Sequence, residues 1–283
     1  MAVANTQSRR EELVRQISEA LERGTLDKQA CLMLRGRLGF ADSFMHGRIG
    51  KLVLKKLIDH AYGKSSRIDE ELRVALQAMQ MRLQHDGPKL VSANSFSQWF
   101  IFTDASYEPS LGTGGLGGVL INAEAQVCAW FGLPLDAATC ISFGSHDKLT
   151  IIYELELLAA IIALNLWSGS HGDELNVHFG DNDGVRFSLV KASAAGTVGQ
   201  RLLAYHIRQE ALKGSRTWFA RVPTECNLSD FPSRGVVHAL LGEDCNASAS
   251  ALVLLSEVLA HLNNGGNSQF SEWGRSDRSA PVS

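Results

Sequence analysis

Residues 99–120 read WFIFTDASYEPSLGTGGLGGVL, and this stretch decides the fold class of the chain. Its first part, WFIFTDAS, is a short apolar run of the kind typical of a buried strand. A glycine-rich loop follows. GGVLINAEAQVCAWFGLPL then predicts two further strands joined by a turn near Asn122 to Ala125. Three strands in succession favour an antiparallel meander.

Helices and strands alternate after the meander. LTIIYELELLAAIIALNLW, at 149–167, predicts a long apolar helix, and ELNVHFGD, at 174–181, predicts a strand ending on an acid. A helical stretch from Asn182 to Lys213, a strand at 216–223 and a short helix around Asn227 to Ser233 follow. Strands separated by helices join a sheet in parallel through right-handed crossovers. We therefore expect an α/β fold with a mixed five-stranded sheet flanked by helices.

The first 90 residues predict helices without strands. LVRQISEALERG has apolar residues every four positions, and Gly24 ends this first helix. Thr25 is expected to cap a second helix through CLMLRGRL. GRIGKLVLKKLIDHAYG predicts a third, and RIDEELRVALQAMQMRLQ predicts a fourth that opens on acids. In the third helix we expect Leu52, Leu54 and Leu57 to face inward and Lys51, Lys55 and Lys56 outward.

These patterns predict the domain organisation. Residues 1–91 form a small all-helical region, and the polar stretch from Ser92 to Gln98 is interpreted as a linker. The α/β domain covers residues 97–240, and a C-terminal amphipathic helix covers 247–263. The Gly-, Asn- and Ser-rich tail, residues 264–283, is expected to be disordered.

Composition excludes several classes of protein. The chain has no run of about 18 uninterrupted apolar residues, which excludes a membrane-spanning helix. The N-terminus resembles neither a secretory signal nor a transit peptide, so we expect a soluble intracellular protein in the cytoplasm or nucleus. The five cysteines are far apart and form no CxxC pair, which supports neither a zinc knuckle nor a disulfide framework.

Charge is distributed unevenly along the chain. The formal net charge is −3, but residues 1–90 hold 16 Lys or Arg and 11 Asp or Glu, a net of +5. The remainder carries a net of −8. Eight basic residues lie between Arg35 and Arg67, opposed only by Asp42 and Asp59. This run is either a solvated face or a surface that binds nucleic-acid phosphates.

Four acids stand out by their positions. Asp104 lies within an apolar strand, Glu156 lies on an apolar helix, Asp181 ends a strand and Asp230 opens a short helix. Singly, the two strand-end or helix-start aspartates could be caps, and the glutamate could pair with an arginine. Together, convergent carboxylates would repel one another, and divalent metal ions would relieve that repulsion. All-oxygen ligation points to Mg²⁺ or Mn²⁺.

The motifs around these acids carry a specific resemblance. FTDASYEPSLGTGGLGGVL resembles the first strand, glycine-rich loop and second strand of type 1 ribonuclease H. ELELLAAIIAL and GDNDGVRFSL resemble that family's first helix and third acidic motif. VPTECNLSDFPSR is similar to the last motif of retroelement ribonucleases H, with Asn followed three residues later by Asp and then Ser-Arg. The resemblance covers roughly residues 97–236.

The helical first third has a resemblance of its own. LRGRLGFADSFMHGRIGKLVLKKL is similar to the segment that joins polymerase and ribonuclease H in retroelement reverse transcriptases. No polymerase carboxylate motif occurs in the chain. The resemblance implies the C-terminal portion of a reverse transcriptase polyprotein, or a domesticated or fragmentary copy, with the parent polymerase as a further partner.

The resemblance implies hydrolysis of the RNA strand of an RNA–DNA hybrid by two Mg²⁺ ions, with Mn²⁺ as a substitute. One ion would activate water and the other would stabilise the leaving 3′ oxygen. Asp104 would bridge both, Glu156 and Asp181 would hold the ion on the leaving-group side, and Asp230 would hold the ion that generates hydroxide. Glu154 and Asp183 are interpreted as exposed neighbours of the ligands, with Asp183 in reserve as a ligand.

Contacts to the nucleic acid are expected at two places. The glycine-rich segment from Gly112 to Gly118 would let backbone approach a sugar, unless it is simply a flexible hairpin. Candidate binding residues are Ser106 and Gly115 there, and Arg48, Lys51 and Lys55 in the basic helical region.

One departure from the family lies just before the last acid. Many cellular members carry a mobile histidine there, whereas this chain reads RVPTEC at residues 221–226. Two other readings stay open. One is a catalytically silent, nucleic-acid-binding or structural remnant of a reverse transcriptase polyprotein. The other is an integrase or exonuclease on the same fold.

Overall fold

The structure, a computed structural model, describes residues 2–45, 47–90, 97–144, 150–168, 174–213, 216–238 and 241–263. The chain divides into two compact units, one ending at Asn94 and one running from Ser95 to Asn263. The expected disordered tail at 264–283 lies outside the described residues. So does the expected linker, except for Ser97 and Gln98, which belong to a strand.

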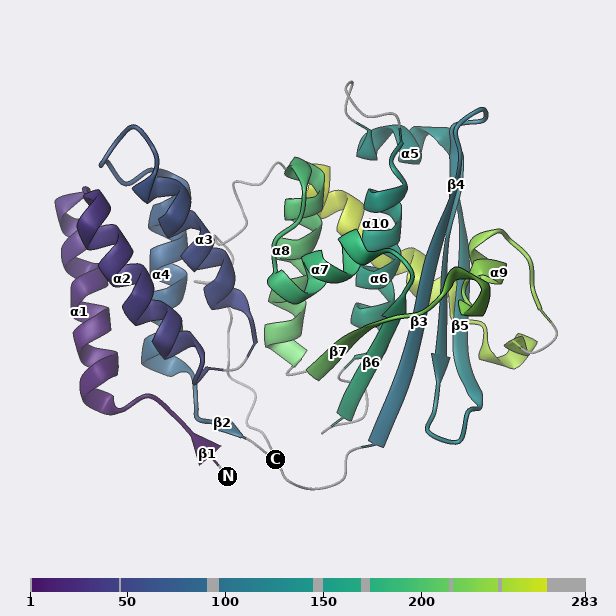
Figure 1. Cartoon of the computed structure of the whole chain (residues 1–283), viewed down its shortest axis with the longest axis horizontal. Coiled ribbons are helices and arrows are strands. Elements are labelled where there is room, and N and C mark those ends of the chain that lie inside the picture. The colour runs from purple at the N-terminus through teal and green to yellow at the C-terminus, as the bar shows by residue number, and fades with distance from the viewer. Residues whose placement is uncertain are drawn as a thin grey trace. The chain divides into compact units, whose positions relative to one another are not determined.

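Four helices make up most of the first unit, as the sequence predicted (Figure 1). They are α1 (Gln7–Arg23), α2 (Lys28–Asp42), α3 (Ile49–Ala61) and α4 (Glu70–His85). One apolar cluster joins all four, with Ile17, Leu38, Leu57 and Met79 fully buried in it.

The expectation that this region lacks strands is wrong. β1 (Ala2–Val3) pairs antiparallel with β2 (Lys89–Leu90) and brings the two ends of the unit together. Two residues are too few to produce an alternating pattern, so such a pairing leaves no periodic signal in the sequence.

The start of α2 also differs from the prediction. Asp27, not Thr25, caps the helix, since its side chain accepts a hydrogen bond from the backbone N–H of Ala30 at 2.9 Å. Thr25 instead forms an isolated antiparallel bridge with Arg67. Both residue types cap helices well, so local sequence could not choose between them.

In α3 the buried side chains are not quite those expected. Val53 and Leu57 are fully buried, one helical turn apart, whereas Leu52 and Leu54 are partly buried at the edges of the same face. A period of 3.6 residues centres the apolar stripe on positions four apart, and Val53 falls on that centre.

The second unit is built on a five-stranded sheet. Its strands are β3 (Ser97–Glu108), β4 (Thr113–Ile121), β5 (Val127–Leu135), β6 (Glu174–Gly180) and β7 (Arg216–Arg221). In space their order is β5-β4-β3-β6-β7. β4 is antiparallel to both of its neighbours, while β3, β6 and β7 are parallel. The expected mixed sheet, with a meander followed by parallel strands, is confirmed.

Helices flank this sheet (Figure 1). The unit contains α5 (Ala137–Phe143), α6 (Ile152–Trp167), α7 (Asp183–Lys191), α8 (Gly196–Lys213), α9 (Asp230–Ser233) and α10 (Ser248–Asn263). In its described residues the unit also has the 3₁₀ turns Thr224–Cys226 and Glu243–Cys245. The apolar α6 is buried nearly all round and packs on β3 and β4, with α8 and α10 against it.

Two features of these helices were not predicted. The helical stretch from Asn182 to Lys213 is broken, because Ala192 adopts a left-handed backbone conformation with φ 54° at the end of α7. Alanine gives no signal for such a break, since it is the best helix former. α5 was missed altogether. Asp136 caps it by accepting a hydrogen bond from the N–H of Thr139 at 2.8 Å.

None of the helices in the described ranges combines the length and the apolar character that crossing a membrane requires.

Candidate active site

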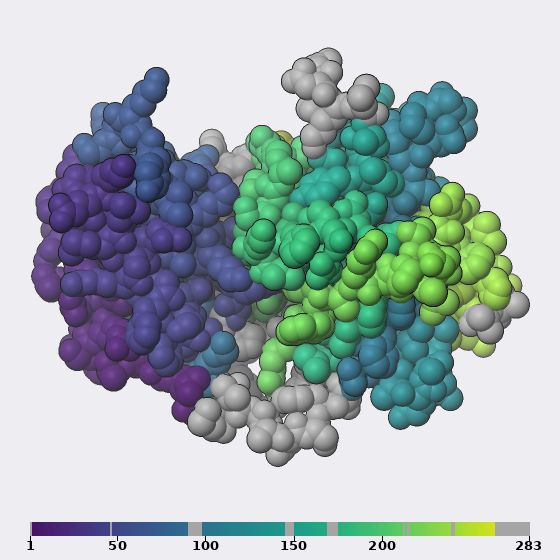
Figure 2. Space-filling model, viewed as in Figure 1, coloured from purple at the N-terminus to yellow at the C-terminus, as the bar shows by residue number. Residues whose placement is uncertain are grey.

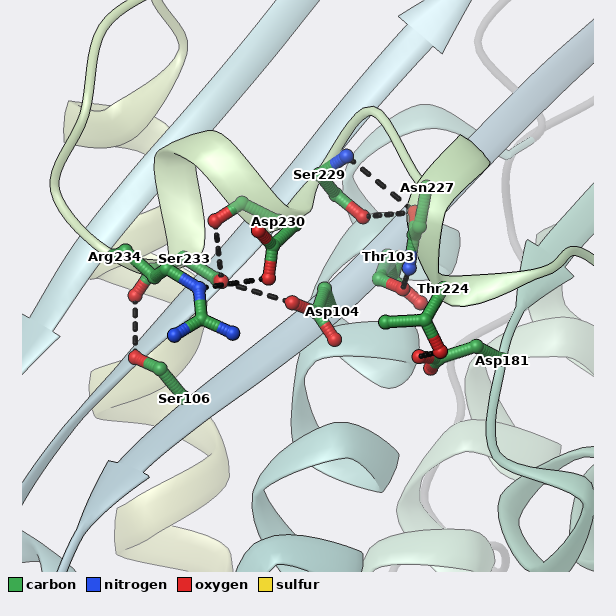
Figure 3. A network of polar contacts seen from close by, with 10 residues as sticks. All are labelled: Thr103, Asp104, Ser106, Asp181, Thr224, Asn227, Ser229, Asp230, Ser233 and Arg234. Carbon is green, nitrogen blue, oxygen red and sulfur yellow. Dashed lines mark hydrogen bonds and ion pairs between the residues drawn. The ribbon is translucent and has the colours of Figure 1, made fainter.

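Asp104 lies in the middle of β3, opposite Gly117 of β4. Its side chain is nearly buried, with 8% of the residue exposed, and Oδ2 accepts a hydrogen bond from the Ser233 hydroxyl at 3.0 Å (Figure 3). Burial raises the pKa of Asp104 to about 6. The Ser233 hydrogen bond opposes this shift, and the charges of Asp181 and Asp230 add to it.

Glu156 lies in the first turns of α6 and, like Asp104, is partly shielded from solvent and close to other acids. Its Oε1 accepts a hydrogen bond from the Asn182 side-chain amide at 3.2 Å. Burial raises the pKa of Glu156 to about 8. The Asn182 hydrogen bond opposes this shift, and the charges of Asp181 and Asp104 strengthen it. The charges of Asp104 and Asp181 therefore both reach the Glu156 carboxyl.

Asp181 follows the last residue of β6, at the carboxyl end of that strand. Its Oδ2 accepts a hydrogen bond from the Thr224 hydroxyl at 2.8 Å. Asp181 is not the cap of α7, because Asn182 has that role and accepts from the N–H of Gly184 at 2.8 Å. Thr224 lies in the stretch that lacks the family's histidine, so here that stretch supplies a hydroxyl that holds an acid.

Asp230 is the first residue of α9. Its Oδ1 forms an ion pair with Arg234 Nε at 2.8 Å (Figure 3). Ser229 occupies the cap position of α9 and makes no side-chain capping hydrogen bond. The interpretation of Asp230 as a simple helix cap is therefore wrong, because its carboxyl is turned to an arginine one helical turn later.

The four acids come from four different elements and act on one another electrostatically around Asp104. Within the described residues, no three His, Cys, Asp or Glu side chains are gathered closely enough to hold a metal ion as they stand. Thr224 and Arg234 hold Asp181 and Asp230, respectively. The donor chemistry, four carboxylates with two of them desolvated, is nevertheless the kind that Mg²⁺ and Mn²⁺ prefer.

The glycines of β4 have a role that the sequence did not reveal. A Cβ atom on Gly115 would overlap the backbone carbonyl oxygen of Ser233, and one on Gly117 would lie 2.5 Å from the carbonyl oxygen of Ser229. On β5, a Cβ atom on Gly132 would lie 2.8 Å from the carbonyl oxygen of Pro232. We call these three glycines the glycine seat, because they allow the backbone of α9 to lie directly on the strands.

The alternation along β4 places α9 and α6 on opposite faces of the sheet. A Cβ atom on Gly114 would point toward Leu155 of α6, whereas its neighbour Gly115 meets α9. Figure 1 shows the same arrangement, and in Figure 2 the light-green segment that holds α9 lies at the surface of the second unit. Residues 114–118 therefore belong to a strand, and their glycines allow close contact with neighbouring elements. This excludes the alternative that they form a flexible hairpin loop.

The five residues expected to contact nucleic acid lie in both units of the chain. The Ser106 hydroxyl donates to the carbonyl oxygen of Ser233 at 2.6 Å, and Gly115 is buried beneath that residue. Arg48 precedes α3, Lys51 is exposed on it, and Lys55 pairs with Asp59 at 3.1 Å. A nucleic-acid role for these residues remains a prediction.

Glu154 and Asp183, the acids that neighbour the proposed ligands in sequence, differ in their exposure to solvent. Glu154 is only 1% exposed, so the interpretation as an exposed neighbour is wrong. Two residues rotate a helix by about 200°, so Glu154 points away from Glu156 into the covered side of α6. Asp183 is partly exposed and pairs with Arg186 at 2.8 Å.

Sequence reasoning missed the residues that hold the acids in place. Ser233, Asn182 and Thr224 each donate a hydrogen bond to one of the four carboxyls. Asn227 anchors the last motif to β3, since its amide donates to the carbonyl oxygen of Thr103 at 3.0 Å. Thr224, Asn227 and Ser233 fall within the last motif quoted above, and Asn182 falls within the third acidic motif, so membership of these motifs was the available signal. The contacts depend on tertiary structure.

Comparisons with known proteins found relatives among solved structures only. No family model and no curated protein matches the chain. Ribonuclease H1 of the halophilic archaeon Halobacterium salinarum is 22% identical, with 48% of this chain and 95% of that one covered and a TM-score of 0.36. The N-terminal ribonuclease H domain of a Mycobacterium tuberculosis protein is 16% identical, with 56% and 99% covered and a TM-score of 0.37.

A third structure is LC11-RNase H1, isolated from compost by a metagenomic approach, in complex with an RNA/DNA hybrid. It is 13% identical, with 49% of this chain and 96% of that one covered and a TM-score of 0.39. These identities and TM-scores are low, and the ribonuclease H-like fold of this chain rests on its own strand order and connections.

Proposed function

We propose that this chain is a metal-dependent endonuclease that hydrolyses the RNA strand of RNA–DNA hybrids. The observation that carries the proposal is the pair of carboxyls Asp104, which is buried, and Glu156, which is half-buried, whose pKa values are raised to about 6 and about 8. The groups that donate hydrogen bonds to them, the Ser233 hydroxyl and the Asn182 amide, are both neutral. Buried acids without a cation are costly, and they cluster at functional sites.

Asp104, Glu156, Asp181 and Asp230 would hold two Mg²⁺ ions, with Mn²⁺ as a substitute. When bound, the ions would supply an activated water and stabilise charge on the cleaved phosphodiester. Asp104 would be shared between them, because its carboxyl already experiences the charges of both Asp181 and Asp230. Ser233 fixes the orientation of Asp104, and Asn182 fixes that of Glu156.

Ser106 is suited to recognising RNA. Its hydroxyl proton is used by the carbonyl oxygen of Ser233, so its oxygen remains an acceptor. A ribose 2′-hydroxyl can donate to such an acceptor, whereas deoxyribose cannot. The backbone of Gly115 lies beside it, opposite Ser106 in the β3–β4 register.

We further propose that the chain derives from a retroelement reverse transcriptase. The spacing of Asn227, Asp230 and the Ser233-Arg234 pair supports this origin, as does the resemblance of the helical first third to a connection segment. The polymerase part of the parent element would then be a natural partner.

The test is cleavage of an RNA–DNA hybrid with labelled RNA by the full chain, beside matched RNA and DNA duplexes. We expect cuts only in the RNA of the hybrid, and only with Mg²⁺ or Mn²⁺ present. A hybrid that is bound but never cut with either ion would contradict the proposal and favour a catalytically silent remnant.

A further inference from the structure

A cavity of about 480 Å³ opens between the β3–β4 hairpin and α9, and its lining residues Ser233 and Arg234 contact Asp104 and Asp230, respectively. Its walls are mostly backbone and small polar groups, and the only cationic side chain among its lining residues is Arg234. The single acid in the lining, Glu108, is engaged by the Ser110 hydroxyl at 2.7 Å. The volume falls within the usual range for small-ligand sites.

Arg234 is placed between this cavity and the candidate active site. It lines the cavity and pairs with Asp230 at 2.8 Å, and 61% of its side chain is exposed. The hydrogen bond and charge of Asp230 raise the pKa of Arg234, and Asp104 adds a smaller contribution. In the free protein, Arg234 is therefore the positively charged partner of Asp230.

That pairing uses only part of the guanidinium. Only Nε is bonded to Asp230. A guanidinium has five N–H donors in a planar fork that matches phosphate oxygens. A metal ion bound to Asp230 would replace Arg234 as the counter-charge of that carboxylate. The guanidinium of Arg234 would then be free at the edge of the cavity.

We propose that Arg234 exchanges partners once Asp230 has another counter-charge, moving from Asp230 in the metal-free protein to a phosphate of the nucleic-acid backbone that enters the cavity. This inference rests on the proposed function, since it takes the ligand to be the nucleic acid bound at the same site. Arg234 thus acts as a phosphate-binding residue that becomes available when its ion pair with Asp230 is broken.

The test is a double-mutant cycle on hybrid affinity, measured by fluorescence anisotropy with labelled RNA–DNA hybrid and excess EDTA. In the wild-type background, Arg234→Gln should change the Kd little, because Asp230 already holds the arginine. In the Asp230→Asn background the arginine is free. The same substitution should there weaken binding roughly tenfold and lower the salt slope by about 1.

A matched control is Arg15→Gln, which removes the same charge from an i,i+4 ion pair whose arginine is similarly exposed, at 62%. It should leave the Kd unchanged in both backgrounds. Equal losses from Arg234→Gln in both backgrounds, or equal losses from Arg15→Gln and Arg234→Gln, would overturn the exchange.

The two proposals can fail separately. A chain that cuts hybrid but shows an additive cycle overturns the exchange alone. A chain that shows the expected cycle but cuts nothing overturns the proposed function alone. A chain that binds no hybrid in any variant overturns both.

Discussion

Among single residues, the site is defined by acids whose surroundings disfavour the charged carboxylate. Asp104 and Glu156 are desolvated and lie near other carboxylates, so their protonated forms persist to higher pH than usual. Hydrogen bonds from Ser233 and Asn182 recover only part of that cost. Such an arrangement stabilises the metal-free fold poorly but suits the binding of a cation.

This arrangement predicts a pH dependence of stability. The pKa of Glu156 is about 8 in the fold against an ordinary 4.5, so between these values the folded chain keeps a proton that the unfolded chain has released. The contribution of Glu156 to the free energy of unfolding is therefore greatest below pH 4.5 and falls as the pH rises toward 8. The slope is at most about 1.4 kcal/mol per pH unit.

Glu156→Gln should therefore remove part of the decline in unfolding free energy between pH 6 and 8, measured by urea denaturation in metal-free buffer. Mg²⁺ should stabilise the wild type more at pH 8 than at pH 5, because the ion competes with the proton. Parallel pH profiles for the wild type and variant would show that Glu156 is not desolvated in this way.

At the scale of elements, the position of α9 depends on the glycine seat of Gly115, Gly117 and Gly132. The helix has only one turn, so its own hydrogen bonds cannot fix it. It is held by direct backbone contact with β4 and β5, and by Asn227 bonded to β3. The position of Asp230 therefore depends on residues more than 90 positions away in the sequence.

Gly117→Ala tests this dependence, because the added Cβ would lie 2.5 Å from backbone atoms of Ser229 and Ser233. We expect a loss of about 1–3 kcal/mol in unfolding free energy, typical of overpacking, and slower hybrid cleavage. Gly36→Ala is the control, since its Cβ meets nothing within 4 Å, and it should be neutral or stabilising by up to about 1 kcal/mol. A Gly117→Ala chain as stable and active as the wild type would refute the seat.

The elements also show what the sequence could predict. β3 and α6 were found because their apolar patterns are local and long. The left-handed break at Ala192 and the glycine seat were not found, because each depends on a backbone conformation or a distant contact that leaves no periodic signal. The four acids could be named from motif order, but the bond from Ser233 to Asp104 joins positions 129 residues apart.

At the scale of the whole molecule, charge separates the two units. The net of +5 in residues 1–90 belongs to the helical unit, and the acidic remainder contains the candidate active site. In the helical unit some basic groups are already paired within the unit, such as Lys55 with Asp59 and Lys56 with Glu71. A phosphate-binding role therefore depends on which cations remain available.

Charge reversal distinguishes a binding surface from a solvated face. Lys51→Glu combined with Lys55→Glu should weaken hybrid binding and flatten its dependence on salt concentration. The control, Arg15→Glu combined with Arg23→Glu on α1, makes the same change in net charge. The readout is the slope of log Kd against log salt, and equal slopes for both double variants would contradict a specific role for α3.

We propose above that Asp104 belongs to a metal-dependent site that cuts RNA in a hybrid. The most direct measurement is the single-turnover cleavage rate of a labelled hybrid with Mg²⁺, compared between the wild type and Asp104→Asn. We expect a wild-type rate that vanishes with EDTA. We also expect a loss in the variant greater than the 10- to 100-fold that removing an outer-shell partner of a metal costs. Equal rates for the two proteins, or cleavage that persists in EDTA, would contradict it.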